Sequence, residues 1–215
     1  MRFQQFLELI QEGEGLQVEF KRKVTSADRV AREMIAFANT KGGTMLFGVD
    51  DDKTIVGVES EKGELEYILP AAQELCDPPV EHEVQIFSTH GLDVVCVHIP
   101  ESKDKPHFLM DGEDPPRAFV RVGEHSVTAS KEMIKVMKHR AGKTGPVRLV
   151  VGEAEKRLFD YFKKNERITV KEYSDLINVS ERRASRLLVR LVRAGVVAIH
   201  TMEKTDYFTL IQESA

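Results

Sequence analysis

The chain has 215 residues, of which 41% are hydrophobic and 31% charged, and this composition is typical of globular domains rather than of disordered chains. Its length suits two domains, each large enough to bury a core of its own. The apolar runs are short and the N-terminus is rich in glutamate, so we expect neither a membrane partner nor a signal peptide. Two cysteines without a CxxC pair predict a reduced, cytoplasmic protein, and the scattered histidines predict no metal site.

The net charge of −4 is divided unevenly along the chain. Residues 146–215 hold 13 Lys and Arg against 10 Asp and Glu, a net charge of +3. Residues 1–145 therefore carry a net charge of −7. The chain average argues against general nucleic-acid binding, but the asymmetry marks the C-terminal part as the candidate for contact with a phosphate backbone.

Strands and helices alternate through the first two thirds of the chain. Apolar spacing predicts a helix at residues 3–11, a strand at 16–21 and a helix at 27–40. A hairpin follows, with strands at 42–49 and 54–58 around a turn at 50–53. The remaining predicted elements are a helix at 61–74, strands at 84–87, 94–99 and 118–122, and a helix at 129–139. This order predicts an α+β fold with a mixed α/β domain at residues 1–140. Two glycines and a proline then mark residues 141–148 as a linker.

The linker contains the tripeptide Gly142-Lys143-Thr144, which matches the end of a phosphate-binding P-loop. That loop also needs a glycine five residues before Gly142, and this position is Met137. We therefore expect no ATP binding and no cofactor.

Residues 149–215 carry the pattern of a winged helix-turn-helix domain. Apolar spacing predicts helices at residues 153–164, 170–177 and 181–195, and two strands within residues 196–211. Thr169 and Glu172 are placed to form a capping box at the start of the second helix, and Ser180 can cap the third. The turn between the last two strands would form the wing.

The third predicted helix has two different faces. At 100° per residue its leucines and Ala184 cluster on one side. A stripe of four arginines falls within about 80° on the opposite side: Arg182, Arg186, Arg190 and Arg193. An apolar anchor with a basic outer face is what a DNA-recognition helix needs. The predicted DNA-contacting residues are Ser180, Arg182, Arg183, Ser185, Arg186, Arg190, Arg193 and, in the wing, Lys204. Because the anchor lies elsewhere, alanine at the four arginines of the stripe is expected to change thermal stability little.

Three blocks of the N-terminal region form a recognisable series: EGEGLQVEFKRKV, AFANTKGGTMLFGVDDDKTIVGV and PHFLMDGEDPPRAFVRVGEHSVTAS. Together they resemble the Schlafen AlbA-type domain over about residues 6–137. Members of this family are regarded as DNA-binding and often stand in front of a winged helix in bacterial transcriptional regulators. The resemblance implies an AlbA-like N-terminal domain and DNA as a partner.

The same resemblance implies an alternative activity. Schlafen members include metal-dependent RNA-cleaving enzymes that use a cluster of carboxylates. Glu14, Glu19 and Lys21 follow their local pattern, and an aspartate of the turn Asp50-Asp51-Asp52, with Asp50 named first, is the candidate third carboxylate. These residues equally fit the polar face of a strand, a glycine-rich loop and an ordinary hairpin turn.

The leading prediction is a homodimeric, DNA-binding transcriptional regulator that contacts DNA mainly through the third C-terminal helix. The alternatives are a metal-dependent endoribonuclease and a protein-interaction module built on the winged helix. The acidic N-terminal domain would touch nucleic acid only through a local basic patch. The candidate residues for this patch are Lys21, Arg22, Lys23, Arg29 and Arg32.

Overall fold

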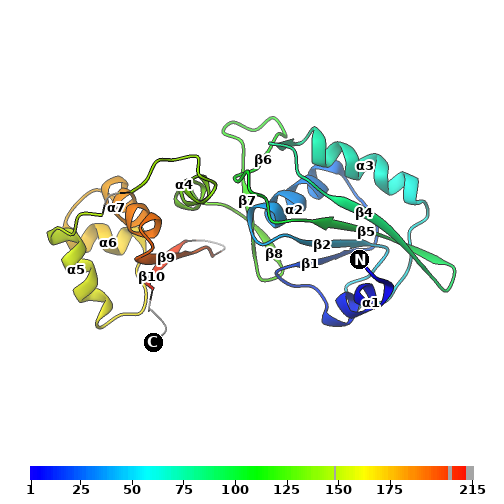
Figure 1. Cartoon of the computed structure of the whole chain (residues 1–215), viewed down its shortest axis with the longest axis horizontal. Coiled ribbons are helices and arrows are strands. Elements are labelled where there is room, and N and C mark those ends of the chain that lie inside the picture. The colour runs from blue at the N-terminus through cyan, green and yellow to red at the C-terminus, as the bar shows by residue number, and fades with distance from the viewer. Residues whose placement is uncertain (148, 203–204, 212–215) are drawn as a thin grey trace. The chain divides into compact units, whose positions relative to one another are not determined.

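The computed structural model describes residues 1–147, 149–202 and 205–211 (Figure 1). Lys204, which was expected to contact DNA from the wing, lies outside these residues. The chain divides into two compact units, Met1–Thr128 and Ala129–Ala215. Across the described ranges, no helix is both long enough and apolar enough to cross a membrane.

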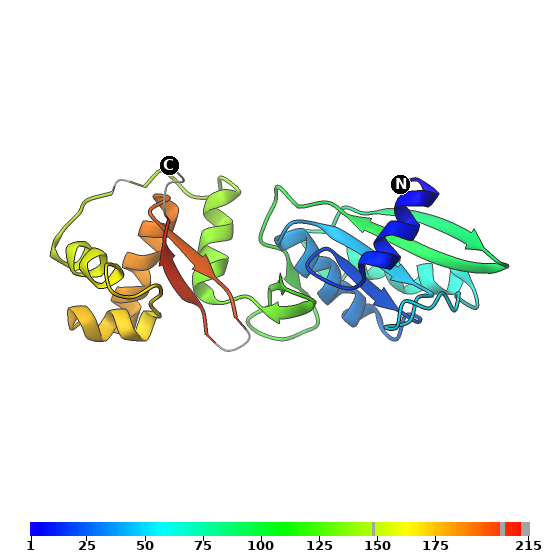
Figure 2. The same cartoon turned by 90° about the horizontal axis from the view of Figure 1, so that it is seen from below.

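The division between the units falls earlier than the sequence-based boundary after residue 140. Helix α4 (Lys131–Arg140) contributes the buried Val136 to the core of the second unit, where Met133 also packs. The helix lies beside α7 (Glu181–Arg193) and the β9–β10 hairpin, as Figure 2 shows. We therefore describe α4 with the second unit.

This change of boundary enlarges the charge asymmetry. The unit Met1–Thr128 holds 13 basic and 24 acidic residues, a net charge of −11. The unit Ala129–Ala215 holds 18 basic and 11 acidic residues, a net charge of +7. Residues 129–145, with five basic residues and one glutamate, account for the whole difference from the values expected for a division at residue 146.

A four-stranded sheet forms the centre of the first unit. Its strand order is β1 (Val18–Lys21), β2 (Gly43–Phe47), β5 (Leu92–Ile99) and β4 (Glu83–Thr89). The first pair is parallel and the other two are antiparallel. Helix α1 (Phe3–Glu12) lies on one side of the sheet, and helices α2 (Ala27–Asn39) and α3 (Glu61–Gln73) lie on the other (Figures 1 and 2).

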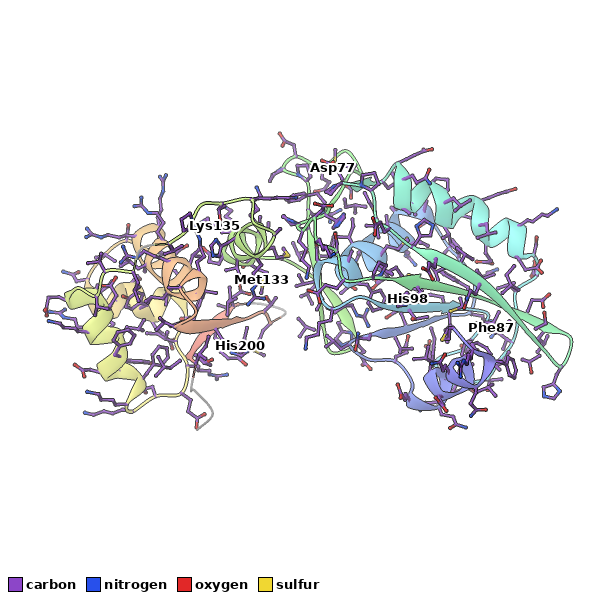
Figure 3. The ribbon with its side chains drawn as sticks, in the orientation of Figure 1. Asp77, Phe87, His98, Met133, Lys135 and His200 are labelled. Atoms are coloured by element: carbon purple, nitrogen blue, oxygen red, sulfur yellow. The ribbon has the colours of Figure 1, made fainter. Side chains whose placement is uncertain are left out.

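Each face of the sheet has a separate apolar cluster, because side chains alternate along a strand. Val18 and Phe20 of β1 pack with α1. Phe87 reaches from β4 to α1, where its ring stacks on Phe6 with 4.5 Å between centroids (Figure 3). Glu19, which lies between Val18 and Phe20 in the sequence, consequently faces the α2 side of the sheet.

Two short antiparallel ladders complete the first unit. One pairs β3 (Cys76–Asp77) with β6 (Phe108–Leu109), and the other pairs β7 (Phe119–Val122) with β8 (His125–Thr128). The predicted strand at residues 54–58 is wrong, since only an isolated bridge joins Val49 to Ile55. The backbone N–H groups of Val56 and Gly57 both donate to the carbonyl of Gly48 at 2.9 Å, so this segment curls over Gly48 and forms no ladder.

The second unit contains the elements expected from its apolar spacing. After α4 come α5 (Glu153–Phe162), α6 (Val170–Ile177), α7, β9 (Val197–His200) and β10 (Tyr207–Leu210). The capping box of Thr169 and Glu172 is confirmed, with the Glu172 N–H donating to Thr169 Oγ1 at 3.2 Å. Asn178 ends α6 with a φ of 53°, a left-handed conformation that Asn tolerates and that allows a tight turn into α7.

Candidate nucleic-acid interface

Helix α7 presents basic side chains on its outer surface. Its inner face is held in the core by Ala184, Leu188 and Leu191, each with no exposed surface. Arg182, Arg183 and Arg186 are exposed, and the residues that the structure describes offer none of them an ion pair. Three uncommitted guanidinium groups on the first half of a helix can donate to phosphates and to base edges.

Ser180 caps the start of the same helix and is exposed. Its carbonyl oxygen accepts hydrogen bonds from the backbone N–H groups of Arg183 and Ala184 at 2.9 and 3.0 Å. Its side chain makes no capping hydrogen bond. The side-chain cap expected at Ser180 is therefore not formed, and contact of its hydroxyl with DNA stays a prediction.

Ser185 does not belong to this outer surface, and its inclusion among the DNA-contacting residues is corrected here. It is 6% exposed, and its hydroxyl donates to the Glu132 carboxylate of α4. This contact joins α7 to a helix that the sequence pattern places in the N-terminal domain, so the pattern does not predict it.

Arg190 and Arg193, in the second half of α7, are half-buried and have partners inside the unit. Arg190 Nη2 donates to Glu155 Oε1 of α5, and the Glu155 side chain is only 4% exposed. Arg193 Nη2 donates to Thr144 Oγ1 at 3.2 Å and to the Gly145 carbonyl at 2.9 Å. These two arginines therefore hold the unit together as well as contributing positive charge. The expectation that alanine at all four stripe arginines would change thermal stability little does not extend to Arg190, because its removal leaves the buried Glu155 without a cation.

The pKa of Glu155 is set by two opposing effects, burial of the carboxyl group and hydrogen bonds to it. Burial alone would raise the pKa of a carboxyl group, because desolvation disfavours the charged form. Hydrogen bonds from the backbone N–H groups of Gly152 and of Glu155 itself, together with the Arg190 guanidinium, outweigh burial. The result is a pKa below the ordinary value, so Glu155 is ionised at neutral pH and the pair with Arg190 is a true ion pair.

A basic pocket lies between α4 and α7, with a volume of about 460 Å³. Lys135 and Lys138 of α4 line it together with Arg186, Arg190 and Arg193 of α7. Among its described lining residues there is no carboxylate. Figure 3 labels Lys135 on α4, on a different side of the helix from Met133, which packs in the core. The two lysines were not predicted, although their spacing on one helical face was visible in the sequence.

The predicted P-loop-like tripeptide lies at the end of α4. The backbone N–H of Lys143 donates to the Lys138 carbonyl at 2.9 Å, and Thr144 Oγ1 bonds with His139 Nδ1 at 2.9 Å. A phosphate-binding P-loop joins a strand to the start of a helix, whereas this segment follows a helix. The tripeptide forms the end of α4, and its Thr144 Oγ1 accepts a hydrogen bond from Arg193 Nη2.

The first unit contains the candidate nuclease residues, and it brings three of them together. Glu19 Oε1 accepts from Lys21 Nζ, and Glu19 Oε2 accepts from Arg121 Nη1 at 2.8 Å. Glu14 Oε1 accepts the backbone N–H of Phe20 at 2.8 Å. Both oxygens of Glu19 and one oxygen of Glu14 thus have a partner within the protein.

Within the Asp-rich turn, the charge that acts on this cluster comes from Asp51 rather than from Asp50. Asp50 pairs with Arg22 at 2.9 Å. Burial raises the pKa of Glu14, the Phe20 hydrogen bond opposes the rise, and the negative charges of Glu19 and Asp51 add to it. No three Asp, Glu, His or Cys side chains in the described ranges gather as metal ligands. The endoribonuclease alternative stays a prediction from the family resemblance.

Arg121 of β7 is the centre of this polar cluster and was not singled out from the sequence. Its side chain has no exposed surface, and it bonds Glu19, Glu33 at 3.1 Å and the Gly15 carbonyl at 2.6 Å. The guanidinium also lies over the Phe37 ring, 4.7 Å from its centroid. One buried arginine therefore connects β7, β1, α2 and the loop before β1.

Comparison with known families agrees with this division of the chain. The family model described as Schlafen, AlbA_2 matches residues 14–130, which is more than half of the chain. The chain therefore belongs to the Schlafen AlbA_2 family. The match ends where α4 begins. No curated protein matches the chain.

Two solved structures resemble the chain at low identity. One is the crystal structure of the DIP2311 protein from Corynebacterium diphtheriae, with 16% identity and a TM-score of 0.49, covering 83% of this chain. This chain spans 32% of that protein. The other is a solution structure of the N-terminal domain of a RecG-related protein from Nitrosomonas europaea, with 19% identity and a TM-score of 0.41, covering 68% of this chain and 94% of that domain.

Proposed function

We propose that the unit Ala129–Ala215 is a winged helix-turn-helix domain that binds DNA, and that the protein is a transcriptional regulator. The order of elements supports this: α6, a tight turn and α7 form the helix-turn-helix, and the β9–β10 hairpin takes the place of the wing. A dimer of the chain would place two copies of α7 on one DNA site.

The observation that carries the proposal is the group of basic side chains on α7 and α4, part of which lines one pocket. Arg182, Arg183 and Arg186 lie at the start of α7, the part of a recognition helix that enters the major groove. The pocket lysines, Lys135 and Lys138, extend this positive surface onto α4. The unit's net charge of +7 attracts a polyanion, whereas the −11 of the first unit repels one.

Family membership is consistent with this proposal, since AlbA_2 domains are regarded as nucleic-acid-binding. The charge distribution nevertheless favours the second unit as the part of the chain that contacts duplex DNA. The first unit then serves regulation or assembly, a role that its acidic surface permits.

The double substitution Arg182→Ala/Arg186→Ala tests the proposal on the DNA sequence that the protein selects from a random pool. If the guanidinium groups contact base edges, each loss costs about 1–3 kcal/mol of binding free energy and relaxes sequence preference. Fluorescence anisotropy at fixed salt concentration measures the change in Kd.

Arg157→Ala is the matched control, because Arg157 is an exposed arginine of α5 in the same unit and does not line the pocket between α4 and α7. It should bind within about twofold of the wild type, in line with the small effect of one distant charge. Wild-type affinity in the Arg182→Ala/Arg186→Ala variant would remove α7 as the DNA reader and favour the protein-interaction module.

The α4 lysines should act differently from the α7 arginines. Lys135→Ala/Lys138→Ala is expected to weaken binding to all DNA sequences alike, because lysines beside a recognition helix contact phosphates rather than bases. The slope of log K against log salt concentration should fall in magnitude by about 2. A salt titration of the anisotropy signal measures this slope, and an unchanged slope would place α4 outside the interface.

A further inference from the structure

The first unit has a second basic pocket, on the α2 side of its sheet. Its volume is about 430 Å³. Lys21 and Lys23 line it from the end of β1 and the segment that follows, and Arg29 and Arg32 line it from α2. Four of the five residues that the sequence suggested as a local basic patch are therefore gathered around one cavity.

The positive charge of this pocket is only partly neutralised by the protein. Glu33 is the one carboxylate among the described lining residues. Its Oε2 accepts from Arg121 Nη1 at 3.1 Å and from Ser126 Oγ, and its Oε1 lies 4.0 Å from Arg32 Nε. Lys23 and Arg29 are exposed, and the described ranges provide no ion pair for either. Like charges held close together repel one another, so an anion in the pocket would relieve that repulsion.

Two of the cations are held in place by contacts that leave them facing the cavity. Arg32 Nη2 donates to the Ser126 carbonyl at 2.7 Å, and its guanidinium lies over the Phe119 ring at 5.4 Å. Lys21 is fixed by its ion pair with Glu19. Cations that are already positioned lose little conformational entropy when they bind a ligand.

The floor of the pocket is apolar. Val30, Met45 and Phe47 line it, and each is nearly or fully buried. A cavity of this volume, with apolar side chains below and a few charged groups at the rim, has the dimensions of a small-molecule site. The −11 charge of the surrounding unit opposes a long polyanion, which has to pass over surface outside the pocket.

We propose that this pocket binds the phosphate monoester of a small organic molecule. Lys23 and Arg29 contact the phosphate oxygens beside the positioned Lys21 and Arg32, and the organic part lies against Val24, a half-buried residue of the pocket lining above the apolar floor. The site is in a different unit from the DNA interface and goes beyond the proposed function. A phosphate in a nucleic-acid backbone carries related chemistry, so the test must separate the two sources.

The test uses the full ¹⁵N-labelled chain in a phosphate-free buffer and follows each backbone amide by NMR. Titration with inorganic phosphate should give saturable shifts at amides near Lys23 and Arg29. In Lys23→Ala/Arg29→Ala the apparent affinity at these amides should fall at least tenfold. Arg22→Ala is the matched control, since Arg22 is a neighbouring exposed arginine that pairs with Asp50 and does not line the pocket.

A second arm identifies the source of the phosphate. A panel of sugar phosphates and nucleoside monophosphates should include compounds that bind these amides at least tenfold more tightly than inorganic phosphate. A single-stranded oligonucleotide without terminal phosphates should bind them more weakly than those monoesters. The proposal is overturned by three outcomes: no saturable phosphate shift near the pocket, equal losses in the Arg22→Ala control, or an oligonucleotide that binds more tightly than every monoester. Signals from α7 report separately on the DNA interface, so failure at one site is distinguishable from failure at the other.

Discussion

Replacing Arg121 with alanine is expected to lower the free energy of unfolding of the first unit by about 3–5 kcal/mol, the range for removing one partner of a buried ion pair. The substitution leaves the carboxylates of Glu19 and Glu33 close to each other without their shared cation. It also leaves the Gly15 carbonyl without its 2.6 Å donor. Hydrogen exchange at β2 amides, read as a function of urea concentration, measures the loss in this unit alone.

Arg117→Ala is the control for this prediction. Arg117 lies four residues earlier, and its ion pair with Asp111 is on the surface, where its side chain is 40% exposed. A pair of this kind contributes about 0–1 kcal/mol. Arg121→Lys should fall between the two variants, since it restores one charge but not the several directed hydrogen bonds. If Arg121→Ala and Arg117→Ala unfold alike, the polar cluster is not what stabilises the unit.

Replacing Arg190 with alanine is expected to destabilise the second unit by about 2–3 kcal/mol. The side chain of Glu155 is almost fully buried, and the variant leaves its charge without a cation. The effect stays below the full range for buried pairs because the Arg190 side chain is 36% exposed. Thermal unfolding and hydrogen exchange of α7 amides measure it, with Arg157→Ala as a control of equal charge change.

The loss of unfolding free energy caused by Arg190→Ala should depend on pH. The folded-state pKa of Glu155 lies below its ordinary value, so the carboxylate adds stability above the unfolded-state pKa and loses it as pH falls through the folded-state pKa. Below that pKa Glu155 is protonated in both proteins. The difference in unfolding free energy between wild type and variant should therefore narrow as the solution is acidified. If this difference stays constant down to strongly acid pH, the lost stability comes from packing of the Arg190 side chain and not from its ion pair.

Local patterns predicted most elements of both units. The apolar repeat at residues 27–40 predicted α2, and the alternation at 94–99 predicted β5, because each signal lies within the element itself. The strand expected at residues 54–58 failed because the Gly48 carbonyl accepts two N–H groups from this segment, a pairing that no periodicity reveals. The unit boundary was misplaced for the same kind of reason, since the partners of α4 lie about fifty residues further along the chain.

The candidate sites show the same limit. The arginine stripe was visible because all its members belong to one helix. Arg190 differs from the exposed members of the stripe because it pairs with Glu155. That partner lies 35 residues earlier, so the pattern within the helix does not reveal the pair. Arg121 was invisible because its partner Glu19 lies 102 residues away. The basic patch of the first unit was predicted as a set of residues, but only the fold brings Lys23 and Arg29 around a cavity.

The opposite net charges of the two units give the chain a large electric dipole moment, whatever their relative placement. In the field of a DNA duplex, the +7 unit is attracted and the −11 unit is repelled, so the molecule experiences a torque before any contact forms. That torque turns the basic unit toward the duplex and raises the fraction of encounters that are productive. Its reach is about one Debye length, roughly 8 Å at physiological ionic strength and 30 Å at 0.01 M, so orientation during approach is a property of dilute salt solutions and fades as salt is added.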